Sequence, residues 1–554
     1  MAKTVRSVVS AVNVLRDRGV SFAFGVPGES FLGLLDALHD TPEIQLISTR
    51  HEGGAAFMAD AAAKLTGQPA ICMGTRGVGS ANLAIGIHTA QQDSTPIIAM
   101  VGQVETPFRH REALQEVELS QFLGPITKWT VEAPSAQSLP RLAAEAYRLS
   151  TTGRPGPVAI ALRSDILDEY VDEEVFPQTA IPAAQPPLTA IRQALELLES
   201  AEQPLIIAGG GVLRSHGVAE LVAFAEAISC PVISAFRRLD AFPTDHPLSL
   251  GSLSFGTPAP ARRRAVEADV VLAIGTRLSE LTTLGYTVPG PGAQLIHVDI
   301  SPDELGRSYP ASVAIAADAA TAIRSFNVNA GGYDWPTTQQ RNQDDRTAYM
   351  DAIEASAGGV DELVDPAIVV KAMAKWLPDN AVTTADAGNF FGWVQRFGSF
   401  RKPGTFLGPT SGAMGYAVPA AVAATIVHQG GVPVVATAGD GGFFMTGNEL
   451  AVAAQLGLPL ICVVFNNALY GTIRLHQERE YPGRVAGTEL RTPDITKYAE
   501  AFGGRGIRVE HNSDAEDAIR DAIAHEGITV IDVTVSRETI APGVKLSEVA
   551  SKRQ

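Results

Sequence analysis

Short apolar runs that alternate with helix-like segments dominate the pattern of hydrophobic and polar residues. Runs of apolar and β-branched residues bounded by turn residues are typical of buried strands, and apolar residues at helical spacing are typical of amphipathic helices. The predicted strands are residues 22–25, 44–47, 70–73, 97–101, 158–161, 270–274, 294–299, 432–438 and 458–465, with a further strand beginning at Pro204. This alternation predicts α/β domains with mainly parallel sheets.

Two stretches with little periodicity divide the chain into three predicted doubly wound domains. Residues 165–187 are acidic and then rich in proline and alanine, and residues 327–359 are polar, so both are predicted to be linkers. The domains are therefore expected at residues 1–165, 188–326 and 360–539. Residues 540–554 are polar and slightly basic, which fits either a disordered tail or a lid.

Composition excludes several classes of protein. The 554-residue chain has a formal net charge of −17, so nucleic acid and anionic membrane are not expected as partners. No apolar run reaches the ~18 residues of a spanning helix. The segment from Met1 to Gly19 predicts an amphipathic helix and not a signal peptide. Cys72, Cys230 and Cys462 lie in or beside apolar runs, as expected for buried thiols in a cytoplasmic protein.

The ends of two predicted strands carry residues suited to bind a metal ion. Strand 432–438 leads into Gly439-Asp440-Gly441-Gly442, and strand 458–465 leads into Asn466-Asn467. The carboxyl ends of parallel strands lie at one edge of a sheet, where ligands bind. Carboxylate, amide and carbonyl oxygens suit Mg²⁺ or Ca²⁺, and glycine lets the backbone approach a diphosphate. Taken singly, Gly-Asp-Gly is equally typical of a surface turn, and Asn-Asn of a helix cap.

The spacing of the two motifs is more informative than either alone. Residues 442–465 number 24, and this arrangement resembles the metal–diphosphate motif of thiamine diphosphate (ThDP) enzymes. The resemblance implies that Asp440, the Asn467 side chain and the Leu469 carbonyl bind Mg²⁺, which anchors the cofactor diphosphate. It also implies cofactor contacts for Gly439, Gly441, Gly442, Tyr470 and Gly471.

Three α/β units with the metal motif in the third resemble the pyrimidine-binding, central and diphosphate-binding domains of ThDP decarboxylases and carboligases. In the first unit, Gly28 and Glu52 match cofactor-binding positions of that family. Glu52 matches the glutamate held against the aminopyrimidine ring, although an acid is also ordinary at a helix N-terminus. That carboxyl favours the tautomer whose 4′-nitrogen removes the thiazolium C2 proton. Loss of Glu52 is therefore expected to prevent activation of the cofactor.

Two segments of the third unit add further cofactor contacts by resemblance. Met414, between Gly412 and Gly415, matches the bulky apolar residue that wedges between the two cofactor rings in the acetolactate synthase branch. Core filling is the alternative role for this methionine. Gly388 and Asn389 match the second diphosphate-contacting loop, or else form an ordinary turn between strand and helix.

Residues 74–82, 88–96 and 101–104 also resemble the acetolactate synthase branch, with Val78 in place of a usual proline. Gln115 falls where pyruvate decarboxylase-like enzymes carry a proton-delivering histidine. A neutral amide cannot act as a general acid, which favours carboligation over protonation. His476 replaces a tryptophan that favours a larger acceptor, so the acceptor need not be a 2-oxo acid. His476 is a substrate contact, an acid/base group or a surface residue.

The central unit carries weaker signals. Residues 209–211, three glycines, and residues 297–300 fit a nucleotide-binding ancestry, but a glycine-rich turn alone is not specific. Residues 277–280 read Arg-Leu-Ser-Glu where acetolactate synthases have an Arg-Phe-Asp-Asp run associated with FAD. The central domain either binds FAD or ADP or is purely structural.

The resemblance predicts a ThDP- and Mg²⁺-dependent enzyme that decarboxylates a 2-oxo acid such as pyruvate and ligates the product to a second carbonyl. It implies a homodimer or homotetramer with sites at the subunit interface. One alternative is a 2-hydroxyacyl-CoA lyase, which residues 387–389 disfavour, or a non-ligating 2-oxo acid decarboxylase. Another is a non-catalytic ThDP-fold binding or regulatory protein, which would not need Glu52. A third is the catalytic subunit of a complex with a separate regulatory chain.

Overall fold

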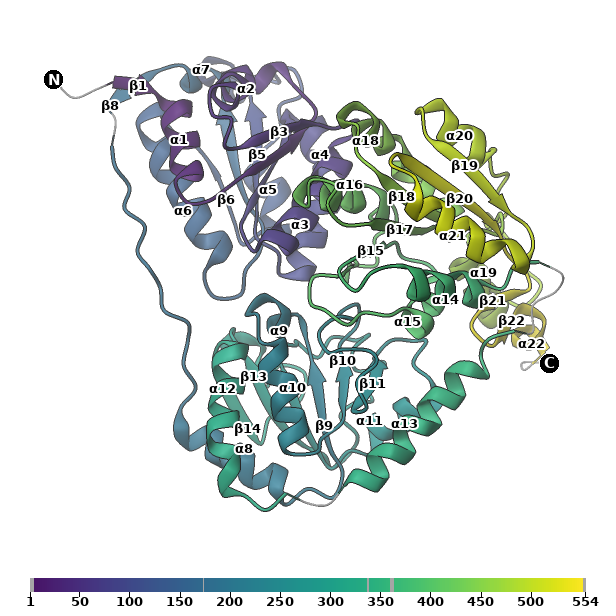
Figure 1. Ribbon diagram of the computed structural model, residues 1–554. Coiled ribbons are helices and arrows are strands. Elements are labelled where there is room, and N and C mark those ends of the chain that lie inside the picture. The colour runs from purple at the N-terminus through teal and green to yellow at the C-terminus, as the bar shows by residue number, and fades with distance from the viewer. Residues whose placement is uncertain (1–3, 173, 336–337, 359–362, 552–554) are drawn as a thin grey trace.

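The computed structural model describes residues 4–172, 174–335, 338–358 and 363–551, arranged as three α/β domains (Figure 1). Each domain contains one six-stranded sheet whose paired strands are all parallel. The predicted fold class is therefore confirmed. No helix in the described ranges is long and apolar enough to cross a membrane.

The first domain is built on the sheet β3-β2-β4-β5-β7-β6. Its strands are β2 (Phe22–Gly25), β3 (Gln45–Ser48), β4 (Ala70–Thr75), β5 (Ile97–Gln103), β6 (Trp129–Glu132) and β7 (Val158–Arg163). One face packs against α1 (Ser7–Arg16), α2 (Leu32–His39) and α6 (Leu139–Thr151), and the other against α3 (Glu52–Thr66) and α4 (Arg76–Asp93). Strands buried on both faces explain the continuous apolar runs of the sequence.

The central domain is built on the sheet β11-β10-β9-β12-β13-β14. Its strands are β9 (Pro204–Ala208), β10 (Val232–Ser234), β11 (Ser249–Ser252), β12 (Val270–Ile274), β13 (Gln294–Asp299) and β14 (Val313–Ala316). Its helices are α8 (Leu188–Glu199), α9 (Gly210–Arg214), α10 (Val218–Ala227), α11 (Ala259–Glu267), α12 (Ala319–Asn329) and α13 (Gln339–Glu354).

The third domain is built on the sheet β16-β15-β17-β18-β20-β19. Its strands are β15 (Val382–Ala385), β16 (Phe406–Leu407), β17 (Val434–Gly439), β18 (Leu460–Asn466), β19 (Arg505–Val509) and β20 (Ile528–Thr534). Its helices are α14 (Pro366–Trp376), α15 (Phe391–Phe397), α16 (Ala417–Val427), α17 (Asp440–Thr446), α18 (Leu450–Leu456), α19 (Gly471–Glu480), α20 (Ile495–Ala501) and α21 (Ala515–Ala524). The 3₁₀ turn η7 (Gly447–Glu449) joins α17 to α18.

The first and third sheets have the same strand order when each is numbered along its own domain, and the central sheet has a different one. In both, the first strand lies between the second and the third. The order therefore reverses between β2 and β4 and, at the equivalent place, between β15 and β17. Ligands of open parallel sheets bind at such a switch point, outside the carboxyl ends of the strands.

Several segments differ from the prediction. Residues 4–6 form β1 (Thr4–Arg6), which pairs antiparallel with β8 (Tyr170–Asp172), so the first helix begins only at Ser7. Met1–Lys3, at the start of the predicted helix, lie outside the described residues. Residues 174–187 form no helix or strand and run along the outside of the molecule (Figure 1).

The second predicted linker is largely helical. Its segment contains α13, which packs on the central domain, where Arg346 donates to the carbonyls of Ser249 and Thr244. The helix escaped prediction because its sequence is mostly polar and it buries only Asn342, Tyr349 and Ile353. The predicted start of the third domain, at residue 360, lies outside the described residues.

The C-terminal residues 540–551 are folded, so a disordered tail is the wrong alternative for them. Strand β21 (Thr539–Ala541) pairs with β22 (Val544–Lys545), and α22 (Leu546–Ser551) follows. Ile540 and Leu546 pack against Leu475 of α19. The last three predicted tail residues, 552–554, lie outside the described residues.

Candidate functional site

Strands β17 and β18 bring the two predicted metal-binding motifs side by side. Gly439 pairs with Phe465, so Asp440 and Asn467 follow neighbouring strand ends. Asp440 is the first residue of α17 and is 2% exposed, which excludes a surface turn. Its Oδ2 accepts a hydrogen bond from Thr492 Oγ1 at 2.7 Å. Burial raises the pKa of the Asp440 carboxyl above its usual value, because desolvation penalises the charged form.

The loop after β18 folds onto the glycines that follow β17. A Cβ atom on Gly441 would lie 2.7 Å from Tyr470 Cε1, and one on Gly471 would lie 3.4 Å from Asn467 Nδ2. The Asn467 Oδ1 accepts from the backbone N–H of Leu469 at 3.1 Å, which closes a tight turn. Both motifs therefore line one edge of the sheet, as the sequence predicts.

The donor chemistry of this edge suits a hard cation better than a transition metal. No cluster of three or more His, Cys, Asp or Glu residues that could hold a metal occurs in the described part of the chain. The predicted set of Asp440, the Asn467 amide and the Leu469 carbonyl contains one carboxylate and leaves positions for water and phosphate oxygens. That composition is typical of Mg²⁺ sites on diphosphates.

Asn389 offers an unused donor at the same edge. Its Oδ1 accepts from Thr472 Oγ1 at 3.0 Å, which joins the loop after β15 to the start of α19. Its Nδ2 is buried and has no hydrogen-bond partner. A buried polar group without a partner is costly, and a phosphate oxygen would satisfy it. Gly388 and Asn389 therefore fit the predicted contact with a diphosphate.

Asp386, which the sequence analysis did not single out, supports the segment that carries Met414. Its carboxylate is 1% exposed and accepts from the backbone N–H of Gly415 at 3.0 Å and of Ala417 at 2.6 Å. Burial raises its pKa to about 6. Gly412 and Gly415 have φ of +72° and +81°, a region that glycine adopts without strain.

Arg237 of the central domain holds Asp386 from the other side. Its Nη2 donates to the Asp386 carbonyl at 2.8 Å and its Nη1 to the Ala385 carbonyl at 3.2 Å. The guanidinium also lies 4.1 Å from the centroid of the Phe391 ring. The central domain therefore helps to position the Met414 segment of the third domain.

Glu52 lies at the carboxyl edge of the first sheet, as the first residue of α3. Its Oε2 accepts from Asn82 Nδ2 at 2.8 Å. Gly28 lies in the neighbouring loop, where a Cβ atom would be 2.9 Å from that of Thr75. No hydrogen bond or ion pair among the described residues joins Glu52 to the loops of Asp440 or Asn467. Within one chain, therefore, no such bond connects Glu52 of the first domain to the metal-binding motifs of the third domain among the described residues.

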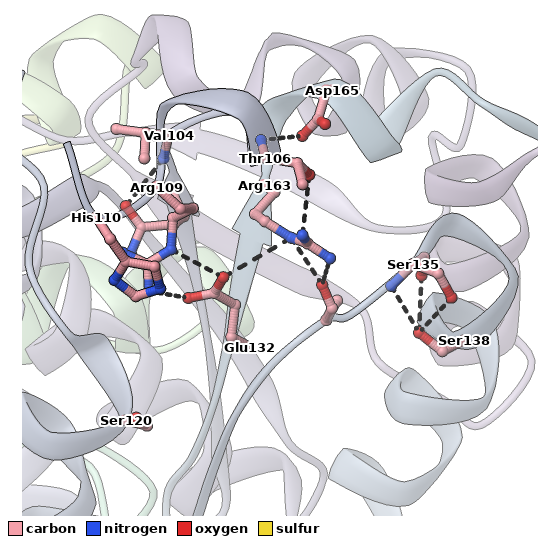
Figure 2. Close-up of polar contacts among 12 residues, drawn as sticks. Val104, Thr106, Arg109, His110, Ser120, Glu132, Ser135, Ser138, Arg163 and Asp165 are labelled. Carbon is pink, nitrogen blue, oxygen red and sulfur yellow. Dashed lines mark hydrogen bonds and ion pairs between the residues drawn. The ribbon is translucent and has the colours of Figure 1, made fainter. Parts of the chain in front are cut away.

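Gln115 lies in a loop that is held by charged residues at the same edge of the first domain. Figure 2 shows part of this network, in which Arg109 donates to Glu132. Arg109 also binds Glu116 at 2.5 Å. Gln115 itself has φ of +60°, and its carbonyl accepts from the backbone N–H of Gly77 at 3.0 Å. Its Oε1 is buried without a partner, so this oxygen is available to accept a hydrogen bond from a ligand.

His476 lies on α19 and is exposed. Its neighbour Ile473 is 54% exposed. His476 has no hydrogen bond or ion pair within the described residues, and substrate contact, acid/base group and surface residue stay the three alternatives for it. Its role stays a prediction.

A cavity of about 1190 Å³ lies where the three domains meet. Gly210, Arg214, Arg277 and Asp299 are among the central-domain residues that line it. Two of the three glycines of the turn after β9 serve packing. A Cβ atom on Gly209 would lie 2.2 Å from the Gly275 carbonyl oxygen, and one on Gly211 would lie 2.6 Å from Gly275 Cα. The glycine motif therefore has a structural explanation, whereas the cavity itself has room for a nucleotide.

Comparisons with known proteins identify all three domains. Residues 8–122 match the thiamine pyrophosphate enzyme N-terminal TPP binding domain, residues 191–326 the central domain, and residues 386–533 the C-terminal TPP binding domain. Thiamine pyrophosphate and ThDP are the same compound.

Three curated relatives match nearly the whole chain. A probable acetolactate synthase large subunit of Methanocaldococcus jannaschii is 30% identical over 98% of this chain and 95% of the relative. An acetolactate synthase of Mycobacterium bovis is 31% identical over 98% and 91%. The acetolactate synthase isozyme 2 large subunit of Escherichia coli is 30% identical over 98% of both chains.

Proposed function

The chain belongs to the thiamine pyrophosphate enzyme family, and from that premise we propose that it transfers a two-carbon unit from pyruvate to a second carbonyl compound. It is an acetolactate synthase-like, ThDP-dependent enzyme that catalyses decarboxylation with carboligation. The proposal concerns the donor, the acceptor and the roles of individual residues. The observation that carries it is the meeting of the Asp440 and Asn467 motifs at neighbouring strand ends.

We propose that Asp440, the Asn467 side chain and the Leu469 carbonyl hold Mg²⁺, and that Asn389 binds the diphosphate through its unpartnered Nδ2. When bound, ThDP supplies the nucleophilic carbon that attacks the 2-oxo acid and the electron sink that releases CO₂. Glu52 would hold the ring nitrogen N1′ of the cofactor by a hydrogen bond through its carboxyl group. Met414 would contact the cofactor rings from the segment that Asp386 anchors.

We propose that the two halves of the site come from different subunits of a homodimer or homotetramer. Glu52 bonds only within its own domain among the described residues. Helix α4, whose Asn82 binds Glu52, presents Val78 and Ile85 to solvent with exposed fractions of 51% and 46%. Apolar side chains on one helix face next to an incomplete site support burial against a second copy. The buried thiols of Cys72, Cys230 and Cys462 support a cytoplasmic location.

Gln115 bears on the fate of the acyl unit. Its amide cannot deliver a proton as a general acid, so transfer to a carbonyl acceptor is favoured over release of an aldehyde. FAD or ADP in the central cavity is a separate proposal, supported by the size and the arginine lining of that cavity. It makes no prediction about the reaction, and fluorescence of flavin released from the purified protein tests the FAD alternative.

A proton NMR time course with ThDP, Mg²⁺ and pyruvate tests the reaction, with Glu52→Gln as the control. We expect acetolactate or acetoin only when Glu52 is intact. Acetaldehyde alone would contradict the role given to Gln115 and indicate a non-ligating decarboxylase. Unchanged pyruvate would refute pyruvate as the donor, and a 2-hydroxyacyl-CoA or a larger 2-oxo acid would be tested next.

A further inference from the structure

Glu449 is a buried carboxylate that joins the third domain to the first within one chain. It ends η7, nine positions after Asp440, and its side chain is 0% exposed. Its Oε1 and Oε2 accept from the backbone N–H of Arg50 at 3.2 and 3.1 Å. The contact spans 399 positions of sequence. Neither the sequence motifs nor the proposed catalytic roles use this residue.

The start of α3 is shaped to receive this carboxylate. A Cβ atom on Gly54 would lie only 2.6 Å from Glu449 Oε1, so the helix backbone approaches the carboxylate directly. The Arg50 guanidinium does not bond to Glu449, because its Nη2 donates to Gln455 Oε1 at 2.7 Å and its Nη1 to the Ser48 carbonyl. Glu449 is therefore held by backbone and not by a salt bridge.

A carboxylate in this place is costly, which argues for a specific task. Burial raises the pKa of Glu449 to about 7. Domain packing alone needs no buried acid, since apolar side chains of similar volume serve at least as well. The carboxylate instead satisfies an N–H group that precedes the helix and would otherwise lack a partner.

Glu52 lies between two such restraints. Arg50, two positions earlier, is held by Glu449, and the carboxylate of Glu52 is held by Asn82 Nδ2 at 2.8 Å. The side chain of His51 accepts from the Gly53 N–H at 3.0 Å and caps the helix. The backbone and the head group of Glu52 are thus fixed by different elements.

We propose that Glu449 is a positioning residue that sets the orientation of Glu52 by anchoring the backbone before it. The inference rests on the proposed role of Glu52 in activating ThDP. It means that the third domain of a chain orients that chain's own pyrimidine-binding glutamate. A catalytic carboxyl group that is misplaced by about 1 Å loses roughly 100-fold in rate, so the effect is measurable.

The test compares Glu449→Ala, which removes the acceptor, with Glu449→Gln, which keeps an amide oxygen in its place. Asp240→Asn is the matched control, because Asp240 is also buried and accepts backbone N–H groups of another domain, those of residues 404–406. Two readouts are used. Amide hydrogen exchange of residues 50–56 is measured in the protein without cofactor, and exchange of the ThDP C2 proton is measured by quenched-flow NMR with Mg²⁺.

We expect Glu449→Ala to lose amide protection at residues 50–56 and to slow C2 proton exchange about 10- to 100-fold. Glu449→Gln should recover most of both, and Asp240→Asn should alter neither. Wild-type protection in Glu449→Ala, or equal slowing in Glu449→Ala and Asp240→Asn, would overturn the positioning role. If Glu52→Gln exchanges the C2 proton at the wild-type rate, the proposed role of Glu52 fails instead.

Discussion

Replacing Gly442 by alanine tests how tightly the edge of the third sheet is packed. A Cβ atom on Gly442 would lie 2.3 Å from Asp386 Oδ2, whereas real Cβ atoms essentially never approach closer than 3.0 Å. The carboxylate would have to move by roughly 0.7 Å, and overpacking of this kind costs about 1–3 kcal/mol. Its two backbone hydrogen bonds, to Gly415 and Ala417, would weaken by about 1 kcal/mol each.

Alanine in place of glycine within a helix returns roughly 0.5–1 kcal/mol, so we expect a net loss of roughly 2–4.5 kcal/mol. Thermal unfolding without ligand measures this loss. Because Asp386 anchors the Met414 segment, the affinity for ThDP with Mg²⁺ should fall as well, which calorimetry measures. Gly439→Ala is the control for the unfolding measurement, since its Cβ atom would be 3.5 Å from the nearest atom, Phe390 Cδ1. Equal stability of Gly442→Ala and wild type would refute the reasoning.

Three further substitutions test other features of the third domain. They concern the buried carboxylate of Asp440, the contact that Asp240 of the central domain makes with residues 404–406, and the packing of the C-terminal tail. Asp440→Asn should raise the unfolding temperature of the ligand-free protein, because it removes a buried carboxylate. It should also abolish the increase in the free energy of unfolding, about 2.7 kcal/mol, that ThDP with Mg²⁺ gives at 100 times its Kd. A retained gain would contradict the metal assignment. Burial raises the pKa of Asp240 from 3.8 to about 6, so wild type should lose up to about 3 kcal/mol of stability as pH rises from 4 to 6. Asp240→Asn should lack this loss, and parallel profiles in urea unfolding would disprove it. Leu546→Ala should expose the tail to limited proteolysis while the global unfolding temperature changes little, and an unchanged cleavage pattern would argue against a packed tail.

The sequence predicts the central strands well because their apolar runs are short and sharply bounded. Residues 22–25, 270–274 and 294–299 form strands with the predicted bounds. The prediction omits the buried strand β20 inside the third sheet, whose apolar run Asp532 interrupts, and also the edge strand β14 and the very short β10. Strand β14 alternates buried and exposed residues, and β10 has only three residues. Such strands depend on pairing with a neighbour, which a local pattern does not contain.

Some residues of the candidate site could also be predicted from the sequence, and others could not. Asp440 and Asn467 could be placed together from sequence because parallel strands deliver their carboxyl ends to one edge. The roles of Asp386 and Glu449 could not be predicted from the sequence. Their hydrogen-bond partners lie 29 to 399 positions away, and these partners are backbone N–H groups, which every residue type except proline supplies. The glycine at position 54 is the one local sign of the Glu449 contact. The cofactor roles of Asp440 and Asn467 stay predictions.

The repeated strand order has a consequence for how this enzyme could be altered. The switch points beside β2 and β15 are created by chain topology and would persist with many different side chains around them. Gln115 and His476 lie in a loop and on an exposed helix face, outside the buried sheets. Substitutions there are tolerated more easily than substitutions in the core. Under the proposed roles of Gln115 and His476, acceptor range is a property that evolution, or directed evolution, can change while the scaffold stays intact.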